Sequence, residues 1–254
     1  MAPRVEFLER IRREVRRAPG LFAASPAARP DRPAEAAAAA RRQMAERWPE
    51  ALERFRQEFE RVNGVFHRVA GLDEVAGVIR DIAREKGARE LAAWAPGELG
   101  LDLRPSLEPQ GVSIAVAPTG GRDDARRRHR EAAARAPIGV TGADFALAET
   151  GTLILISGAG RPRSTSLLPD THVAIFDRER LLETLEQVGV MLEALHADAE
   201  RSMSGGVISF ITGPSRTADI ELTLTRGVHG PKEVHAIFVG TRWPSISPPA
   251  RWRP

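Results

Sequence analysis

A turn in the back half of the chain presents a carboxylate that could do chemistry. Glu149 stands two residues before Gly151, where an expected short helix gives way to an apolar strand. A carboxylate that projects from such a turn can serve as a nucleophile or as a general base. A glutamate that caps a helix or faces solvent fits the same residues, so both interpretations stay open. The neighbouring groups that we include in the candidate site are Thr141, Gly142, Thr150 and Gly151.

A second polar segment, residues 161–172, combines cationic and hydroxyl side chains directly after an apolar run. If its serines open a helical turn, free backbone N–H groups add further donors there. This combination suits a phosphate or a carboxylate, because guanidinium groups bind both through paired hydrogen bonds. An arginine-rich surface loop is the alternative. The candidate ligand-binding residues of this segment are Arg161, Arg163, Ser164, Thr165 and Ser166.

Two further polar segments follow later apolar runs. In residues 213–221, Thr217 is placed to cap a helix that has acidic residues in its first turn. In residues 226–235, a turn with two glycines leads into the last expected strand. Any one of these loops is a weak signal, and the four together are a stronger one if the fold brings them to one rim. The candidate ligand-binding residues here are Ser215, Arg216, Thr217, His229 and Lys232.

The usual cofactor and metal signatures are missing from the chain. The nearest approach to a dinucleotide-binding loop starts Gly158-Ala-Gly160 and has an arginine in place of the third glycine. No Gly-Lys-Ser/Thr loop, His-Glu-x-x-His or Gly-x-Ser-x-Gly sequence occurs, and the chain has no cysteine. We therefore expect no metal and no cofactor in this chain, and no iron–sulfur cluster held by its own thiolates.

The elements that must position these segments alternate along residues 64–240. The strands that we expect are 65–69, 90–94, 112–116, 138–140, 152–157, 172–177, 207–212 and 234–240. The helices that we expect are 72–86, 123–135, 178–195 and a short one after Ala143. This alternation predicts an α/β fold with a mostly parallel central sheet flanked by helices. Ligands of such sheets bind beyond the carboxyl ends of the strands, which directs attention to the loops after residues 140, 157, 177, 212 and 240.

The first 63 residues predict a helical extension. Apolar residues recur at helical spacing from Met44 to Val62, and Pro49 predicts a kink or a break near Trp48. This extension could pack on the core of its own chain or on a partner subunit. The expected organisation is thus a helical extension over 1–63, an α/β domain over 64–240 and a proline-rich tail over 241–254.

Charge is divided unevenly along the chain. Residues 1–63 carry 14 arginines and 10 carboxylates, whereas residues 137–240 carry 8 basic and 13 acidic side chains. The two parts could complement each other within one chain or between subunits of a homo-oligomer, or they could be solvated helix faces. The net charge is only +3, so the pI near 10.3 does not indicate a large excess of basic residues. It reflects the lack of groups that titrate between pH 8 and 10. Acidic residues are interleaved with the N-terminal arginines, so we do not expect a nucleic-acid partner.

The sequence also gives an expectation for localisation. No apolar run reaches the length of about 18–20 residues that a membrane helix needs. The first residues lack the apolar centre of a signal peptide. Together with the absence of disulfides, these features predict a cytoplasmic protein.

Residues 137–240 contain four longer stretches with a distinctive sequence: GADFALAETGT at 142–152, SLLPDTH at 166–172, GPSRTADIE at 213–221 and GVHGP at 227–231. In these stretches and in their order, residues 137–240 resemble the LUD domain of the lactate-utilisation protein C (LutC) family. The resemblance implies a fold similar to that of coenzyme A transferases, ribose-5-phosphate isomerase and glucosamine-6-phosphate deaminase. It also implies a role in bacterial oxidation of L-lactate to pyruvate, beside partner proteins that carry iron–sulfur motifs.

Two functions therefore stand as expectations. The first is a component of a lactate-oxidising system that binds a small anionic ligand and leaves iron–sulfur clusters to its partner subunits. The second is an independent enzyme of the acyl-transfer or sugar-phosphate isomerase type that uses Glu149. The turn Ala148-Glu149-Thr150-Gly151 looks similar to the Ser-Glu-Asn-Gly turn that bears the nucleophile of family I coenzyme A transferases. The flanking Ser and Asn are absent here.

Overall fold

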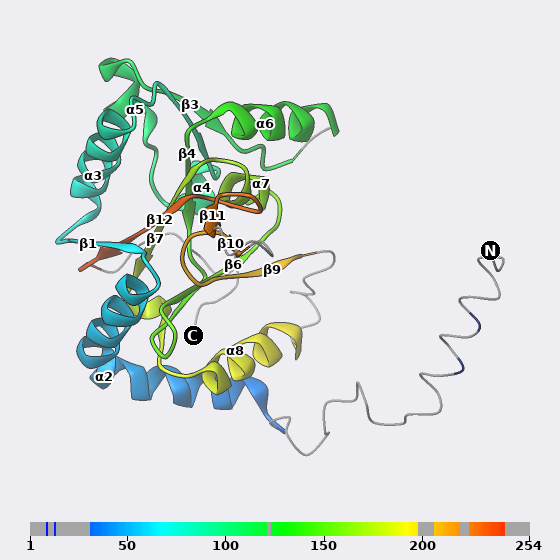
Figure 1. Cartoon of the computed structure of the whole chain (residues 1–254). Coiled ribbons are helices and arrows are strands. Elements are labelled where there is room, and N and C mark those ends of the chain that lie inside the picture. The colour runs from blue at the N-terminus through cyan, green and yellow to red at the C-terminus, as the bar shows by residue number, and fades with distance from the viewer. Residues whose placement is uncertain are drawn as a thin grey trace.

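The computed structural model describes Glu9, Arg13 and residues 31–120, 123–197, 206–218 and 224–241, with backbone alone at 217–218 and 224–226. Figure 1 shows a central sheet with helices around it. The helices are α2 (Pro33–Arg61), α3 (Leu72–Glu85), α4 (Pro96–Leu99), α5 (Arg104–Leu107), α6 (Asp123–Arg135), α7 (Ser164–Leu167) and α8 (Leu185–Ala197), with 3-10 turns at Glu108–Gln110 and Arg178–Arg180.

Six parallel strands form the main sheet. Their spatial order is β1 (Val65–Val69), β12 (Glu233–Val239), β7 (Thr171–Asp177), β4 (Ile138–Gly142), β2 (Glu90–Ala93) and β3 (Ser113–Val116). The central strands are buried along nearly their whole length, as expected for strands covered on both faces. The predicted α/β fold with a mostly parallel sheet is confirmed.

A second sheet of four strands lies beside the main sheet. It contains β8 (Leu181–Leu182), β5 (Phe145–Leu147), β6 (Thr152–Ile156) and β9 (Ile208–Ile211), and β6 runs antiparallel to both of its neighbours. The short helix expected after Ala143 is therefore wrong, because those residues form β5. A buried apolar run of three residues has no helical period to distinguish it from a strand.

The helix predicted over 178–195 is only partly correct. The Asp177 side chain accepts a hydrogen bond from the N–H of Glu179, 3.0 Å away, and this bond holds a 3-10 turn. The chain then extends through β8 and starts α8 at Leu185. The expected helix cap at Thr217 is also wrong: β10 (Arg216–Ala218) pairs with β11 (Leu224–Arg226), and residues 219–223 lie outside the described part.

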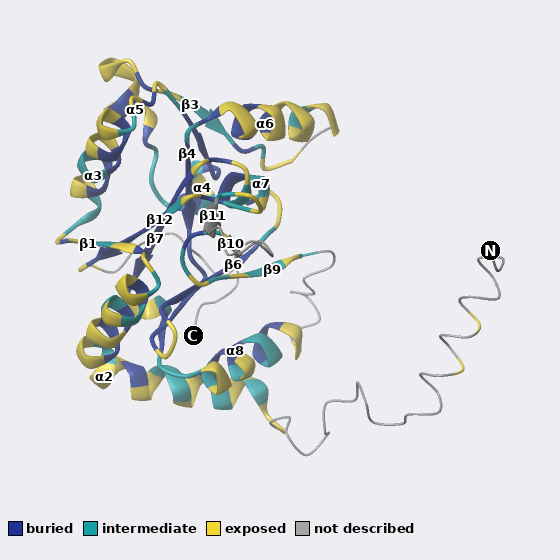
Figure 2. Ribbon diagram, viewed as in Figure 1, coloured by how far each residue is buried: buried dark blue, intermediate teal, exposed yellow. Residues whose placement is uncertain are grey.

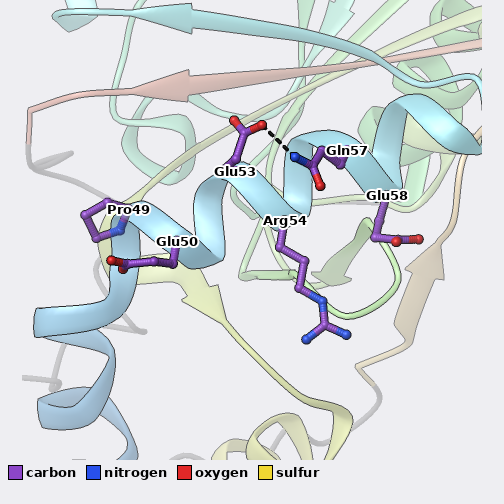
Figure 3. Close-up of a pocket in the computed structure, with 6 residues that line it drawn as sticks. All are labelled: Pro49, Glu50, Glu53, Arg54, Gln57 and Glu58. Carbon is purple, nitrogen blue, oxygen red and sulfur yellow. Dashed lines mark hydrogen bonds between the residues drawn. The ribbon is translucent and has the colours of Figure 1, made fainter.

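Helix α2 packs on the core of its own chain. Phe55 stacks on Phe59 at 5.3 Å between ring centroids and meets Phe176 of β7 edge to face at 5.0 Å. The helix continues through Pro49, and its axis changes direction there (Figures 1 and 3). The apolar residues in the second half of α2 therefore pack within their own chain. Figure 2 shows the buried side of the helix turned toward the sheet. The tail predicted over 241–254 lies, apart from Thr241, outside the described residues.

Among the helices of the described residues, none is both long enough and apolar enough to cross a membrane.

Candidate functional site

The loop between β6 and α7 covers the carboxyl ends of β2 and β3 in the main sheet. The chain goes from β2 to β3 in one direction and from β4 to β7 in the other, so the switch point at which ligands of open α/β sheets usually bind lies between β2 and β4. The Gly160 N–H donates to the carbonyl of Pro118, and its carbonyl accepts from the N–H of Ala95, each at 2.9 Å. A Cβ at Gly160 would approach Thr119 to 3.2 Å. The chain's own loop thus fills the expected place of a ligand.

Arg161 belongs to this loop and is buried. It forms an ion pair with Asp144, which also accepts a hydrogen bond of 2.6 Å from the N–H of Ile156. The guanidinium also lies over the Trp94 ring, 4.7 Å from its centroid. Burial lowers the pKa of Arg180, also close to Asp144, to about 10. Arg161 therefore fastens the loop to the second sheet.

Thr141 and Gly142 end β4 and are buried. The hydroxyl of Thr141 lies 2.8 Å from Nε2 of His172 on the neighbouring strand β7. Burial, with a smaller effect of His235, lowers the pKa of His172 to about 3, so this imidazole is neutral at physiological pH. These groups belong to the interior of the protein.

Glu149 caps a helix. Its carboxylate accepts a hydrogen bond of 2.9 Å from the N–H of Leu185, the first residue of α8. Its own N–H donates to the carbonyl of Glu183 at 3.1 Å. A carboxylate at a helix N-terminus is stabilised by the free N–H groups and by the helix dipole. This is the capping alternative considered for the sequence.

The rest of the Glu149 turn is held by hydroxyl contacts and by α2. Thr150 and Thr152 bring their hydroxyls to 2.6 Å, and Thr152 reaches Thr212 of the next segment at 2.7 Å. Gly151 has a φ of 61° and lies against the backbone of α2, where a Cβ would come within 2.6 Å of the Phe59 Cα. The turn therefore docks on the end of α2.

Glu149→Ala is expected to destabilise the protein by about 1 kcal/mol, because it removes a cap and a favourable dipole interaction. Glu149→Gln retains an amide oxygen that can accept the same bond, so its cost should be a few tenths of that. Urea unfolding followed by circular dichroism measures both. Glu46→Ala, at an exposed position inside α2, is the control, and an equal loss there would contradict the capping role.

The last two polar segments meet at the opposite, amino edge of the main sheet. The Ser215 hydroxyl accepts a hydrogen bond of 3.3 Å from the N–H of His229, and a Cβ at Gly230 would contact both Ser215 and Leu167 of α7. Lys232, directly before β12, forms an exposed ion pair of 2.9 Å with Asp170, directly before β7. We call Leu167, Asp170, Ser215, His229 and Lys232 the amino-edge cluster.

Helix α7 joins this cluster to the sheet. Thr165 is buried, and its hydroxyl lies 3.0 Å from Nε2 of His129 in α6. The Ser166 hydroxyl donates to the carbonyl of Arg163 at 3.0 Å. Arg163 is exposed and stands one helical turn before Leu167, next to the partly buried Ser164. Arg163 is thus an exposed cationic residue one helical turn from Leu167 of the amino-edge cluster.

Arg216 points away from the amino-edge cluster toward α2. Its guanidinium donates a hydrogen bond of 2.6 Å to the carbonyl of Val62, just past the end of the helix. A cation at a helix C-terminus is favoured by the helix dipole. Thr217 lies next to it in β10.

The four polar segments do not share one rim, so this expectation is wrong. Arg161 lies at the carboxyl edge, Glu149 at α8, and the amino-edge cluster at the other end of the sheet. The reason is that β7 runs parallel to β4, so residues 157–170 must return the chain to the amino edge. Sequence reasoning missed Asp144, and an acidic residue amid the apolar run of 138–147 was the available signal.

A shallow hollow lies on the outer surface of α2 (Figure 3). Glu53 there is hydrogen-bonded to Arg56 and Gln57, which lower the pKa of its carboxyl to about 2. None of the residues that line the hollow belongs to the four polar segments. Within the described residues, no three His, Asp or Glu side chains are grouped so that they could hold a metal ion.

Comparison with known proteins identifies relatives. The chain is 37% identical to a lactate utilization protein C of Halalkalibacterium halodurans over 172 residues, which are 67% of this chain and 71% of that protein. It is 36% identical to a lactate utilization protein C of an Exiguobacterium species over 178 residues, covering 67% and 68% of the two chains.

A solved structure supports the fold. A DUF162 family protein from Deinococcus radiodurans superposes with a TM-score of 0.50 at 22% identity, over 76% of this chain and 98% of that one. The model of the LUD domain matches residues 52–239, from the second half of α2 to the end of β12. The chain therefore belongs to the LUD domain family.

Proposed function

We propose that this protein is a component of a bacterial L-lactate utilisation system, in which L-lactate is oxidised to pyruvate. The observation that carries the proposal is the identity of 37% to a protein named lactate utilization protein C over 67% of the chain. The second relative matches over the same share of the chain and has the same name.

The role that we propose for this chain is to bind a small anion, such as a carboxylate, rather than to carry electrons. The chain has no cysteine, so it has no thiolate ligands for an iron–sulfur cluster. We place the clusters in partner proteins of the system.

The amino-edge cluster supports this role best among the four polar segments. Its exposed cationic or hydrogen-bonding side chains are Asp170, His229 and Lys232, and Arg163 lies one helical turn away. Lys232 is paired with Asp170 at the surface, where an anion can compete for it, whereas Arg161 is paired with a buried carboxylate and Arg216 is bonded to a helix end. A carboxylate or phosphate would be bound here by charge-assisted hydrogen bonds.

Deletion of the gene in its bacterial host is expected to abolish growth on L-lactate and to leave growth on glucose unchanged. The intact gene on a plasmid should restore growth on lactate. A deletion strain that grows normally on L-lactate would contradict the proposed function.

Complementation with variants tests the anion site separately. A triple variant of the site should fail to restore lactate growth although the protein accumulates normally, because three donors to the anion are lost. A matched triple variant of exposed residues elsewhere should restore growth. If both variants restore it, the ligand site is wrong while the pathway assignment stands. The site variant is Arg163→Ala, His229→Ala, Lys232→Ala, and the control is Arg80→Ala, Arg84→Ala, His196→Ala.

A further inference from the structure

Two histidines, His67 and His235, face each other across the β1–β12 strand pair, outside the amino-edge cluster. Nε2 of His67 lies 3.0 Å from Nδ1 of His235. The ring planes differ by only 9°, and the ring centroids are 5.3 Å apart. That separation is what two rings have when they lie edge to edge in one plane and meet at these nitrogens. The contact is therefore an N–H···N hydrogen bond rather than a stack of ring faces.

The hydrogen bond continues into a chain of charged groups. Nε2 of His235 lies 3.5 Å from the carboxylate of Glu233, which forms an ion pair of 2.6 Å with Lys86 at the end of α3. Lys86 also pairs with the exposed Glu85 at 3.0 Å. A carboxylate favours a hydrogen on the imidazole nitrogen that faces it. We assign that hydrogen to Nε2 of His235, which leaves Nδ1 as the acceptor for the N–H of His67.

The surroundings make a charge on this pair costly. Burial lowers the pKa of both histidines, and the pKa of His235 is lowered further by His67. From β12 and α3, Glu233 favours a charge on His235 and Lys86 opposes it. His172 on β7 is itself neutral, and Arg68 of β1 turns to the other face of the sheet, over Phe238.

We propose that His67 and His235 form a pH-sensitive latch that holds edge strand β1 on the sheet. With no added proton, the facing nitrogens share one hydrogen as N–H···N. With one added proton, the pair still has one donor and one acceptor at this contact. With two added protons, both facing nitrogens carry a hydrogen and both rings are positively charged. The two nitrogens are only 3.0 Å apart, so the rings repel each other and the contact breaks.

The position of the latch gives it a structural consequence. β1 is an edge strand whose partner among the described strands is β12. β1 starts three residues after Val62. The carbonyl of Val62 accepts a hydrogen bond from Arg216, which directly follows Ser215 of the amino-edge cluster. Release of β1 would therefore loosen the segment that joins α2 to the amino-edge cluster. The latch itself does not depend on the function proposed above.

The sign of the pH dependence follows from linkage. Both pKa values are lower in the closed form than in a free histidine, so protons favour the open form. As the pH falls below about 6.5, the ordinary pKa of histidine, the equilibrium constant for opening rises about tenfold per pH unit for each extra proton that the open form binds. The latch is closed at neutral pH and opens as the pH falls.

The first test is an NMR titration of the intact protein labelled with ¹⁵N in its histidines. We expect Nε2–H tautomers for both residues at pH 7.5, and two coupled protonation steps below pH 6.5. Independent single-step titration of the two rings with ordinary pKa values would overturn the latch.

The second test is hydrogen–deuterium exchange of the β1 amides at pH 7.5 and pH 5.0, corrected for intrinsic exchange. Protection should fall about tenfold or more in the intact protein. In His67→Gln, which can still donate a hydrogen bond and does not titrate, the fall should be less than about threefold. His196→Gln, at an exposed position on α8, is the matched control and should behave as the unmodified chain. Equal protection of β1 at both pH values in the unmodified chain would also overturn the proposal.

Discussion

Asp144→Asn is expected to lower the free energy of unfolding by about 3–5 kcal/mol, the usual cost of breaking a buried ion pair from one side. Asp144 and Arg161 are 6% and 7% exposed. The amide keeps the shape of the side chain but removes its charge, so the guanidinium of Arg161 is left without its buried counter-charge. The N–H of Ile156 also loses a charged acceptor at 2.6 Å.

Urea unfolding monitored by tryptophan fluorescence measures this loss, and Trp94 is a suitable reporter because Arg161 lies over its ring. Asp170→Asn is the matched control. It removes the carboxylate of the exposed pair with Lys232, and such pairs contribute at most about 1 kcal/mol. Equal losses in the two variants would show that burial does not distinguish the two pairs.

Gly151→Ala is expected to destabilise the protein by several kcal/mol, for two reasons that can be separated. The φ of 61° disfavours any residue with a Cβ. In addition, the new Cβ would come within 2.6 Å of the Glu58 carbonyl carbon and of the Phe59 Cα, both in the backbone of α2. Backbone of a packed helix cannot move aside as a flexible side chain can, so the Glu149 turn has to leave its place.

Gly87→Ala isolates the conformational part of this effect. Gly87 has the same φ of 61°, and a Cβ there would meet no atom within 4 Å. The strain alone should cost about 1–2 kcal/mol. The difference between the two variants in thermal or urea unfolding then measures the clash with α2. If the two variants lose the same stability, the close approach of the turn to α2 is wrong.

These variants bear on the meaning of the family motifs. In the described structure, Glu149 caps α8, Arg161 is paired with Asp144, and Arg216 holds the end of α2. Each polar side chain joins a loop to an element that is distant in the sequence. Motif residues can thus be required for the fold, and substitution of one of them has to be accompanied by a stability measurement before any loss of function is assigned to the ligand site.

The sequence by itself determined the elements whose pattern is local. The parallel strands were predicted within about two residues of their bounds, because each is a short apolar run between turns. Helix α6 was predicted over its full range. The kink at Pro49 follows from the lost N–H of proline. The motifs at 142–152 and 213–221 also indicated the family to which the chain belongs.

Only the tertiary structure decided where these elements meet. Leu181–Leu182 carry a helical apolar spacing and nevertheless form β8, because β5 offers them strand pairing. In the second sheet, the pairings of β5 with β8 and of β6 with β9 join segments far apart in the sequence. The edge at which each polar segment lies follows from strand direction, and so does the meeting of His67 with His235. Local sequence fixes the period of an element, but its partners are selected by burial and hydrogen bonding across the whole chain.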